Sequence, residues 1–168
     1  RLMEKLQNHD GQDSVRVLRP ADSEAATVCW QMAMENMETP TALIFSRQNV
    51  KSLPEGTDYQ QTRKGAYIVT GSDEQFDVIL VASGSEVSTC VDGASLLRKD
   101  GLKIRVVSAP SEGLFRRQSK EYQEQVLPKD AKIFGLTAGL PVTLEGLVGA
   151  NGKVYGLNSF GFSAPYKV

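Results

Sequence analysis

An unbroken apolar run stands in the middle of the chain, from Val78 to Ala82, and a Gly/Ser turn follows it. Because no polar positions alternate with the apolar ones, the run predicts a strand in a sheet that is covered on both faces. Apolar residues then recur at helical spacing as far as the stop signal Asp100-Gly101, and Ser83 with Glu86 has the spacing of a capping box for this helix. A second apolar run at 103–108 predicts the next strand, so these elements form one βαβ unit.

The first fifty residues carry a shorter pattern of the same kind. They predict a strand at 14–18, a helix at about 24–36 and a strand at 41–46, with a short helix possible over Leu2–Leu6. Two strands and one helix cannot bury both faces of a sheet. We therefore expect residues 1–50 to be the incomplete end of a separate α/β domain.

Periodicity disappears in residues 51–64, where Pro, Gly and charged residues are mixed. This composition predicts a linker over the surface. The remaining residues, 65–168, predict a complete three-layer α/β/α domain with a mainly parallel, mixed sheet of five strands. We expect those strands at 66–69, 78–82, 104–108, 132–136 and 154–157.

Composition limits the classes of function. Nineteen Lys and Arg residues against twenty Asp and Glu residues give no electrostatic basis for binding nucleic acid, and no apolar run approaches a membrane span of about 20 residues. Arg1 replaces an initiator Met and no signal peptide follows it, which we interpret as a fragment of a longer protein. Cys29 and Cys90 lie on apolar helix positions without a CxxC motif, so we expect buried thiols in a reducing, cytoplasmic compartment rather than a disulfide.

Few side chains form a constellation that carries chemistry. His9 is the single histidine, so neither a Ser-His pair nor a metal ligand set is expected. The turn Ser83–Glu86 exposes N–H groups that suit a small anion, although Glu86 would repel phosphate and helix capping is preferred. Arg47 follows a predicted strand at its carboxyl end, where ligands meet α/β sheets, and its guanidinium suits phosphate. A surface arginine that caps carbonyl groups is the alternative interpretation of Arg47.

Other conspicuous residues are assigned structural roles. Arg19 stands at a predicted strand end, and the cluster Arg116-Arg117 with Lys120 is interpreted as a solvated helix face. Trp30 and Tyr122, each within a helical pattern, are expected in the core or at an interface.

Several motifs in order resemble transketolase. They are RPAD at 19–22, TPTAL at 39–43, SRQN at 46–49, DVILVASGSEV at 77–87, KIRVVSAP at 103–110, YQEQVLP at 122–128 and FGFSAP at 160–165. This resemblance implies the end of a pyrimidine-binding domain in residues 1–50 and the transketolase C-terminal domain, without its terminal helix, in residues 65–168. The segment 140–146 departs from the family, many members of which have aromatic and histidine residues there.

The resemblance also implies a function. The intact enzyme would transfer a two-carbon ketol unit from a ketose phosphate to an aldose phosphate in the pentose phosphate pathway, as a homodimer with thiamine diphosphate and a divalent cation, Mg²⁺ or Ca²⁺. In the family, the arginine that matches Arg47 binds the phosphate of the sugar. The family's cofactor loop, metal ligands and catalytic histidines lie upstream of Arg1. We therefore expect no catalytic, cofactor or metal residue here, no bound cofactor, and an inactive chain with a structural and dimerisation role.

Two alternatives remain open at this point. In the first alternative, the chain is an autonomous α/β module that binds a small anion at Ser83–Glu86. In the second, it is the C-terminal domain of a related thiamine-dependent enzyme. Deoxyxylulose phosphate synthase and the 2-oxo acid dehydrogenases are such relatives. The SRQN and FGFSAP segments favour transketolase over both.

Overall fold

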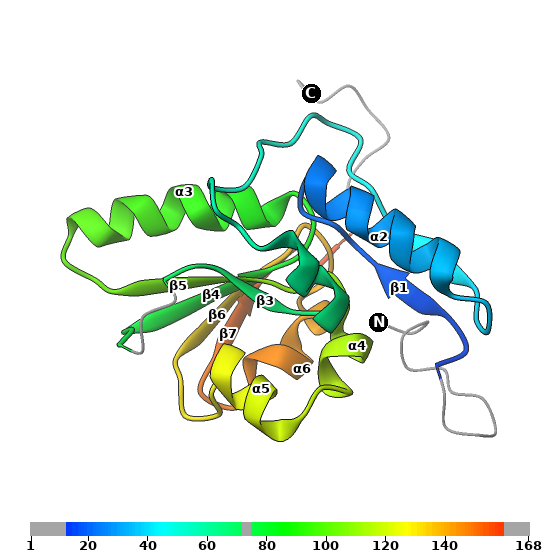
Figure 1. Ribbon diagram of the computed structural model, residues 1–168. Helices are drawn as coiled ribbons and strands as arrows, with labels where there is room; N and C mark the ends of the chain where they lie inside the picture. The colour runs from blue at the N-terminus through cyan, green and yellow to red at the C-terminus, as the bar shows by residue number, and fades with distance from the viewer. Residues whose placement is uncertain (1–12, 72–74, 160–168) are drawn as a thin grey trace.

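The computed structural model describes residues 13–71 and 75–159 of the chain (Figure 1). Its strands are β1 (Arg16–Leu18), β2 (Thr41–Leu43), β3 (Tyr67–Thr70), β4 (Val78–Ala82), β5 (Ile104–Ser108), β6 (Ile133–Leu136) and β7 (Lys153–Tyr155). Its α-helices are α2 (Ser23–Glu35), α3 (Glu86–Lys99), α4 (Glu112–Arg116), α5 (Lys120–Val126) and α6 (Glu145–Val148). Two 3₁₀ helices accompany them, η1 (Tyr59–Lys64) and η2 (Pro141–Thr143).

The larger sheet has five strands in the order β3-β5-β4-β6-β7. Strand β4 runs parallel to both β5 and β6, β6 runs parallel to β7, and β3 is antiparallel to β5. The mainly parallel, mixed sheet expected from the sequence is thereby confirmed. Strand β4 has its predicted bounds, whereas the strand expected at 154–157 is found at Lys153–Tyr155.

Helices cover both faces of this sheet. Helix α3 lies on one face, and α4, α5 and α6 lie on the other (Figure 1). Successive residues of a strand point to opposite faces, so Ile79 and Val81 pack in one core cluster with Phe115 of α4. Leu80 and Ala82 pack in the other cluster, beneath α3. The apolar run in β4 is continuous because neither of its faces is left to solvent.

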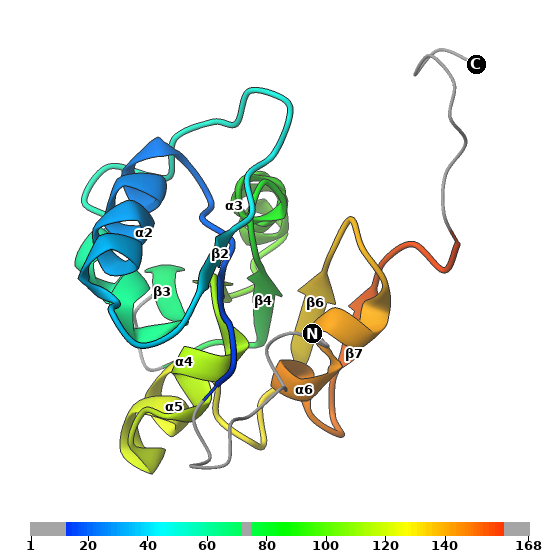
Figure 2. The same cartoon turned by 90° about the vertical axis from the view of Figure 1, so that its right-hand side faces the viewer.

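The N-terminal piece is a separate two-stranded parallel sheet, β1 and β2, beside helix α2 (Figure 2). Helix α2 begins after Asp22, whose carboxylate Oδ1 accepts a hydrogen bond of 3.0 Å from the N–H of Ala25. Its buried residues are Ala25, Val28, Cys29 and Met32, which is the apolar face that the sequence predicts.

The second strand of this piece is shorter than predicted. The strand expected at 41–46 ends at Leu43. In a parallel pair, every second N–H of β1 faces β2, beginning with Arg16, which donates to the carbonyl of Pro40 at 2.9 Å. The third donor of this series is residue 20, a proline that has no N–H. The ladder therefore stops, and the chain after Leu43 continues as an exposed loop.

Residues 51–64, the predicted linker, are more ordered than their composition indicates. Leu53 is buried, and its N–H donates to Asp22 Oδ2 at 2.8 Å. Helix η1 (Tyr59–Lys64) follows, with Thr62 buried and Gly65 in the left-handed conformation at its end. One buried leucine and one short 3₁₀ helix do not produce a repeating pattern of apolar residues. The order of this segment could therefore not be predicted from its periodicity.

The predicted capping box at the start of α3 is wrong. The N-cap residue is Ser85, and its side chain makes no capping hydrogen bond. The side chains of Ser83 and Glu86 contact the guanidinium of Arg19 instead, at 3.2 Å and 2.7 Å. An ionised donor is a stronger partner for a carboxylate than a backbone N–H.

The predictions for isolated core positions have mixed outcomes. Cys29 and Cys90 are free, buried thiols in different core clusters, so the disulfide alternative is excluded. Tyr122 is partly buried against the core, and its hydroxyl donates to a backbone carbonyl at 2.9 Å. Trp30 is 55% exposed and stacks on Phe45 at 6.3 Å between ring centroids. A core position for Trp30 is therefore wrong, and its role at an interface stays a prediction.

Some predictions fall on residues that the structure does not describe. The short helix at Leu2–Leu6, His9 and the motif at 160–165 all lie outside the described residues. Within residues 13–71 and 75–159, no helix has the length and apolar character needed to cross a membrane.

Candidate functional site

Arg19 joins the N-terminal piece to the turn between β4 and α3. Its guanidinium contacts Ser83 and Glu86, and its carbonyl accepts the N–H of Gly84 at 3.3 Å. Gly84 has φ +65°, and a Cβ at this position would lie 2.7 Å from Arg19 Nε. The structural role predicted for Arg19 is confirmed. The turn Ser83–Glu86, considered above as an anion site, already holds the cation of Arg19.

A second connection runs through the buried carboxylate of Asp22. It accepts hydrogen bonds from the N–H of Ala25 at 3.0 Å, the N–H of Leu53 at 2.8 Å and the hydroxyl of Tyr59 at 2.8 Å. Burial, and secondly the hydrogen bond to Asp22, raise the pKa of Tyr59 far above its usual range. The carboxylate therefore ties the start of α2 to residues 51–64, beside the carboxyl ends of β1 and β2.

Arg47 lies in the bend that follows β2, and its side chain is exposed. In the same bend, Ser46 Oγ donates to the carbonyl of Gln48 at 3.2 Å. A hollow of about 380 Å³ lies between this bend and the start of α2, and Ser46, Gln48 and Asn49 are among its lining residues. Because the Asp22 side chain already accepts an N–H at the start of α2, an anion in the hollow would receive its hydrogen bonds from the exposed side chains of the bend.

The structure does not bring the two predicted anion sites together. Arg47 stands beside the hollow at the start of α2, whereas Ser83 and Arg19 line a different hollow at the ends of β4, β5 and β6. Sequence reasoning missed the pairing of Arg19 with Glu86, which lie 67 positions apart. The RPAD motif marked Arg19 and Asp22, but nothing local in it identifies their partners.

Metal ligation finds no support in the described residues. Across residues 13–71 and 75–159, no three His, Cys, Asp or Glu side chains come together as a possible metal site. We therefore assign no metal ligand to the described part of this chain.

Comparison with known proteins gives a consistent result. Residues 65–168 match a family model described as the transketolase-like TK C-terminal domain. Over 155 residues, the chain is 42% identical to a transketolase of Staphylococcus epidermidis and 43% identical to one of Staphylococcus aureus, with 90% of this chain aligned. The solved transketolase from Leishmania mexicana superimposes with a TM-score of 0.82 and 34% identity over 92% of this chain and 22% of that chain. The chain spans 23% of the length of the two curated relatives.

Proposed function

Because the chain belongs to the transketolase family, we propose that it is the C-terminal part of an enzyme that transfers a two-carbon ketol unit from a ketose phosphate to an aldose phosphate. The proposal divides it into the end of a pyrimidine-binding domain (1–50), a linker (51–64) and the C-terminal domain (65–168). The relatives named above are transketolases, which favours this assignment over the other thiamine-dependent enzymes. An autonomous anion module is disfavoured because Arg19 already occupies the Ser83–Glu86 turn.

Arg47 is proposed to bind the phosphate of the sugar substrate. The observation that supports this role is its place, exposed in the bend after β2, where its neighbours Ser46 and Gln48 line the hollow at the start of α2 although Arg47 itself does not. A planar, permanently charged guanidinium can hold a phosphate with two parallel hydrogen bonds. Such a clamp fixes one end of the substrate, so the reacting carbonyl at the other end is oriented without contact from Arg47.

The intact enzyme is proposed to use thiamine diphosphate together with Mg²⁺ or Ca²⁺. When bound, the thiamine diphosphate supplies the stabilisation of a carbanion. The described residues contain no cluster of ligands that fits the cation, so no step of the reaction is routed through them. On the family resemblance, we further propose a homodimer in the cytoplasm. The two free, buried thiols are in keeping with a reducing compartment.

By this proposal, the isolated chain has no ketol-transfer activity, and residues 65–168 serve assembly rather than chemistry. A deletion of residues 65–168 from the intact enzyme should then damage the dimer, measured by analytical ultracentrifugation, more than it alters the chemistry at the cofactor. A truncated enzyme that keeps its dimer and loses only turnover would contradict the assembly role.

The role of Arg47 can be tested in a graft of this chain onto the upstream part of the Staphylococcus epidermidis transketolase. Arg47→Ala should raise KM for phosphorylated sugars about 10- to 100-fold, since hydrogen bonds to charged groups contribute about 1.5–3 kcal/mol. The KM for glycolaldehyde, which has no phosphate, should not change. Lys51→Ala is the matched control, because it removes a nearby positive charge that is 72% exposed and paired with Asp92. Equal effects of Arg47→Ala on both classes of substrate would refute the phosphate role.

A further inference from the structure

A groove of about 530 Å³ lies between α5, α6 and the loop that leads into β6. Its floor is apolar and consists of core side chains: Phe115, Leu127, Ile133, Leu147 and Val148. Pro128 and the pair Gly149-Ala150 also line it. A cavity of this size and lining suits a small organic molecule. We call it the α5–α6 groove.

The rim of the α5–α6 groove is basic, and two of its cations are available. Arg116 is engaged, since its Nε lies 2.8 Å from Glu112 Oε1 and its guanidinium also donates to the carbonyl of Gly146. Lys120 and Lys129 also line the groove and form no ion pair within residues 13–71 and 75–159.

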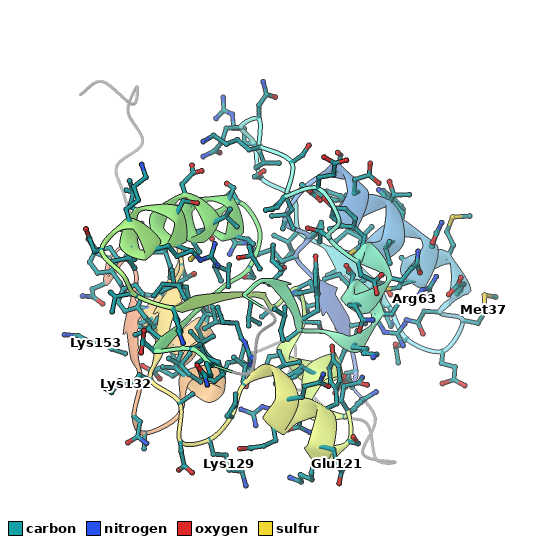
Figure 3. The ribbon with its side chains drawn as sticks, turned by 60° about the vertical axis from the view of Figure 1, so that its left-hand side comes forward. Met37, Arg63, Glu121, Lys129, Lys132 and Lys153 are labelled. Atoms are coloured by element: carbon teal, nitrogen blue, oxygen red, sulfur yellow. The ribbon has the colours of Figure 1, made fainter. Side chains whose placement is uncertain are left out.

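One acid, Glu124, also lines the groove. Its carboxylate accepts the backbone N–H of Lys129 at 3.2 Å and keeps its negative charge, so it offsets part of the positive charge of the two rim lysines. Figure 3 labels Lys129 near α5, and Lys132 and Lys153 at the edge of the sheet formed by β6 and β7. The groove therefore combines an apolar floor with a rim on which two lysines without an ion pair in the described residues outweigh one acid.

We propose that the α5–α6 groove binds a small amphiphilic organic anion, with an apolar body on the floor and one carboxylate or phosphate near Lys120 and Lys129. The floor side chains are only 3–8% exposed, so the apolar body contributes affinity through the small part of their surface that the groove leaves open to water. The two lysines supply selectivity for a negative head group. This site is distinct from the bend that carries Arg47 and does not depend on the proposed function.

Three probes with the same eight-carbon body and different head groups test the proposal: octanoate, octanol and octylamine. Each is titrated into the full 168-residue chain and followed by ¹H–¹⁵N NMR. We expect octanoate to bind most tightly and octylamine least, with shifts centred on Leu127 and Leu147. Octanoate shifts scattered over the surface, or equal affinity for the three probes, would overturn the proposal.

Variants at the rim separate charge from shape. Lys120→Met and Lys129→Met should each weaken octanoate binding about two- to fivefold and leave octanol binding unchanged, as expected for exposed ion pairs. Lys153→Met, an exposed lysine outside the groove, is the matched control. Ala150→Trp fills the groove from an exposed rim position and should abolish binding of octanoate and octanol alike. An effect of Lys153→Met equal to those of the rim variants, or octanoate binding that survives Ala150→Trp, would also overturn it.

Discussion

Replacement of Asp22 by Ala tests whether one buried carboxylate holds the N-terminal piece to the rest of the chain. The side chain is 4% exposed and accepts three hydrogen bonds, from Ala25 N, Leu53 N and Tyr59 Oη. These donors belong to α2, to the segment after β2 and to η1. In the described contacts, no other carboxylate accepts hydrogen bonds from these three donors. Removal of the Asp22 carboxylate therefore lowers the stability directly.

The magnitude follows from the three bonds. Loss of an N-cap costs about 1 kcal/mol. An unpaired, buried N–H of Leu53 costs about 1–3 kcal/mol. Tyr59 is a partly buried residue, so we assign its hydrogen bond the lower part of the usual range, about 0.5–1 kcal/mol. Together, Asp22→Ala should lower the free energy of unfolding by about 2.5–5 kcal/mol, a large part of the 5–15 kcal/mol typical of a domain. Asp22→Asn keeps one acceptor and should cost less.

Urea unfolding followed by far-ultraviolet circular dichroism measures these differences. Tyr59→Phe provides a double-mutant cycle: with Asp22 already replaced, it should have almost no further effect, because its partner is gone. Asp92→Ala is the matched control, since this carboxylate is 60% exposed in its ion pair and should change stability by less than about 1 kcal/mol. A loss under about 0.5 kcal/mol for Asp22→Ala, or additive effects of Asp22 and Tyr59, would refute the reasoning.

Three further predictions concern the same junction and the core. Arg19→Ala should lower the free energy of unfolding by about 1.5–3 kcal/mol, because Glu86, 12% exposed, loses its cation; equal stability of this variant and the parent in urea would contradict it. Gly84→Ala should lower the free energy of unfolding by about 1–2 kcal/mol, because position 84 has a left-handed conformation. The loss should be larger with Arg19 present than in Arg19→Ala, because the added Cβ would lie against the Arg19 side chain; urea titrations of the parent, both single variants and the double variant measure this difference. Burial raises the pKa of Cys29 and of Cys90 from 9.0 to about 12, so from pH 9 to 12 the unfolded chain releases protons that the folded chain keeps. Stability should therefore fall with rising pH, by at most about 1.4 kcal/mol per pH unit for each thiol, and more steeply in the parent than in the Cys29→Ala, Cys90→Ala variant.

The elements that could be predicted from the sequence are those with a strong local pattern. Strand β4 is recognisable because five successive apolar residues need cover on both faces, and α2 because its buried positions repeat at helical spacing. Helix η1 has no comparable signal, since a 3₁₀ helix of six residues has only one buried position, Thr62. The end of β2 depends on a missing N–H at Pro20, which lies two residues after the partner strand β1. Such information exists only once the register of the pair is known.

The capping box illustrates why the candidate site was harder to predict than the fold. Ser83 and Glu86 have the spacing for a local cap, and the same two side chains also fit a guanidinium from elsewhere. Local spacing cannot decide between these partners, because Arg19 is close to Glu86 only in the folded chain. The sequence pattern around Lys120 likewise predicts only a solvated helix face. The groove that it lines is completed by Leu147 and neighbouring residues of the segment after β6.

The segment 19–22 shows how a short motif can have a role that none of its residues reveals alone. Arg19 holds the turn before α3, Pro20 stops the β1–β2 ladder, and Asp22 caps α2 while it accepts the N–H of Leu53. Each of these contacts helps to set where the bend after β2 begins and which way it leaves the sheet. Ser83 and Glu86 of the C-terminal domain therefore contact the segment that precedes α2 and this bend, although no residue of that domain lines the hollow at the start of α2. Under the proposed function, that domain would influence phosphate binding through the backbone of this junction rather than by direct contact with the substrate.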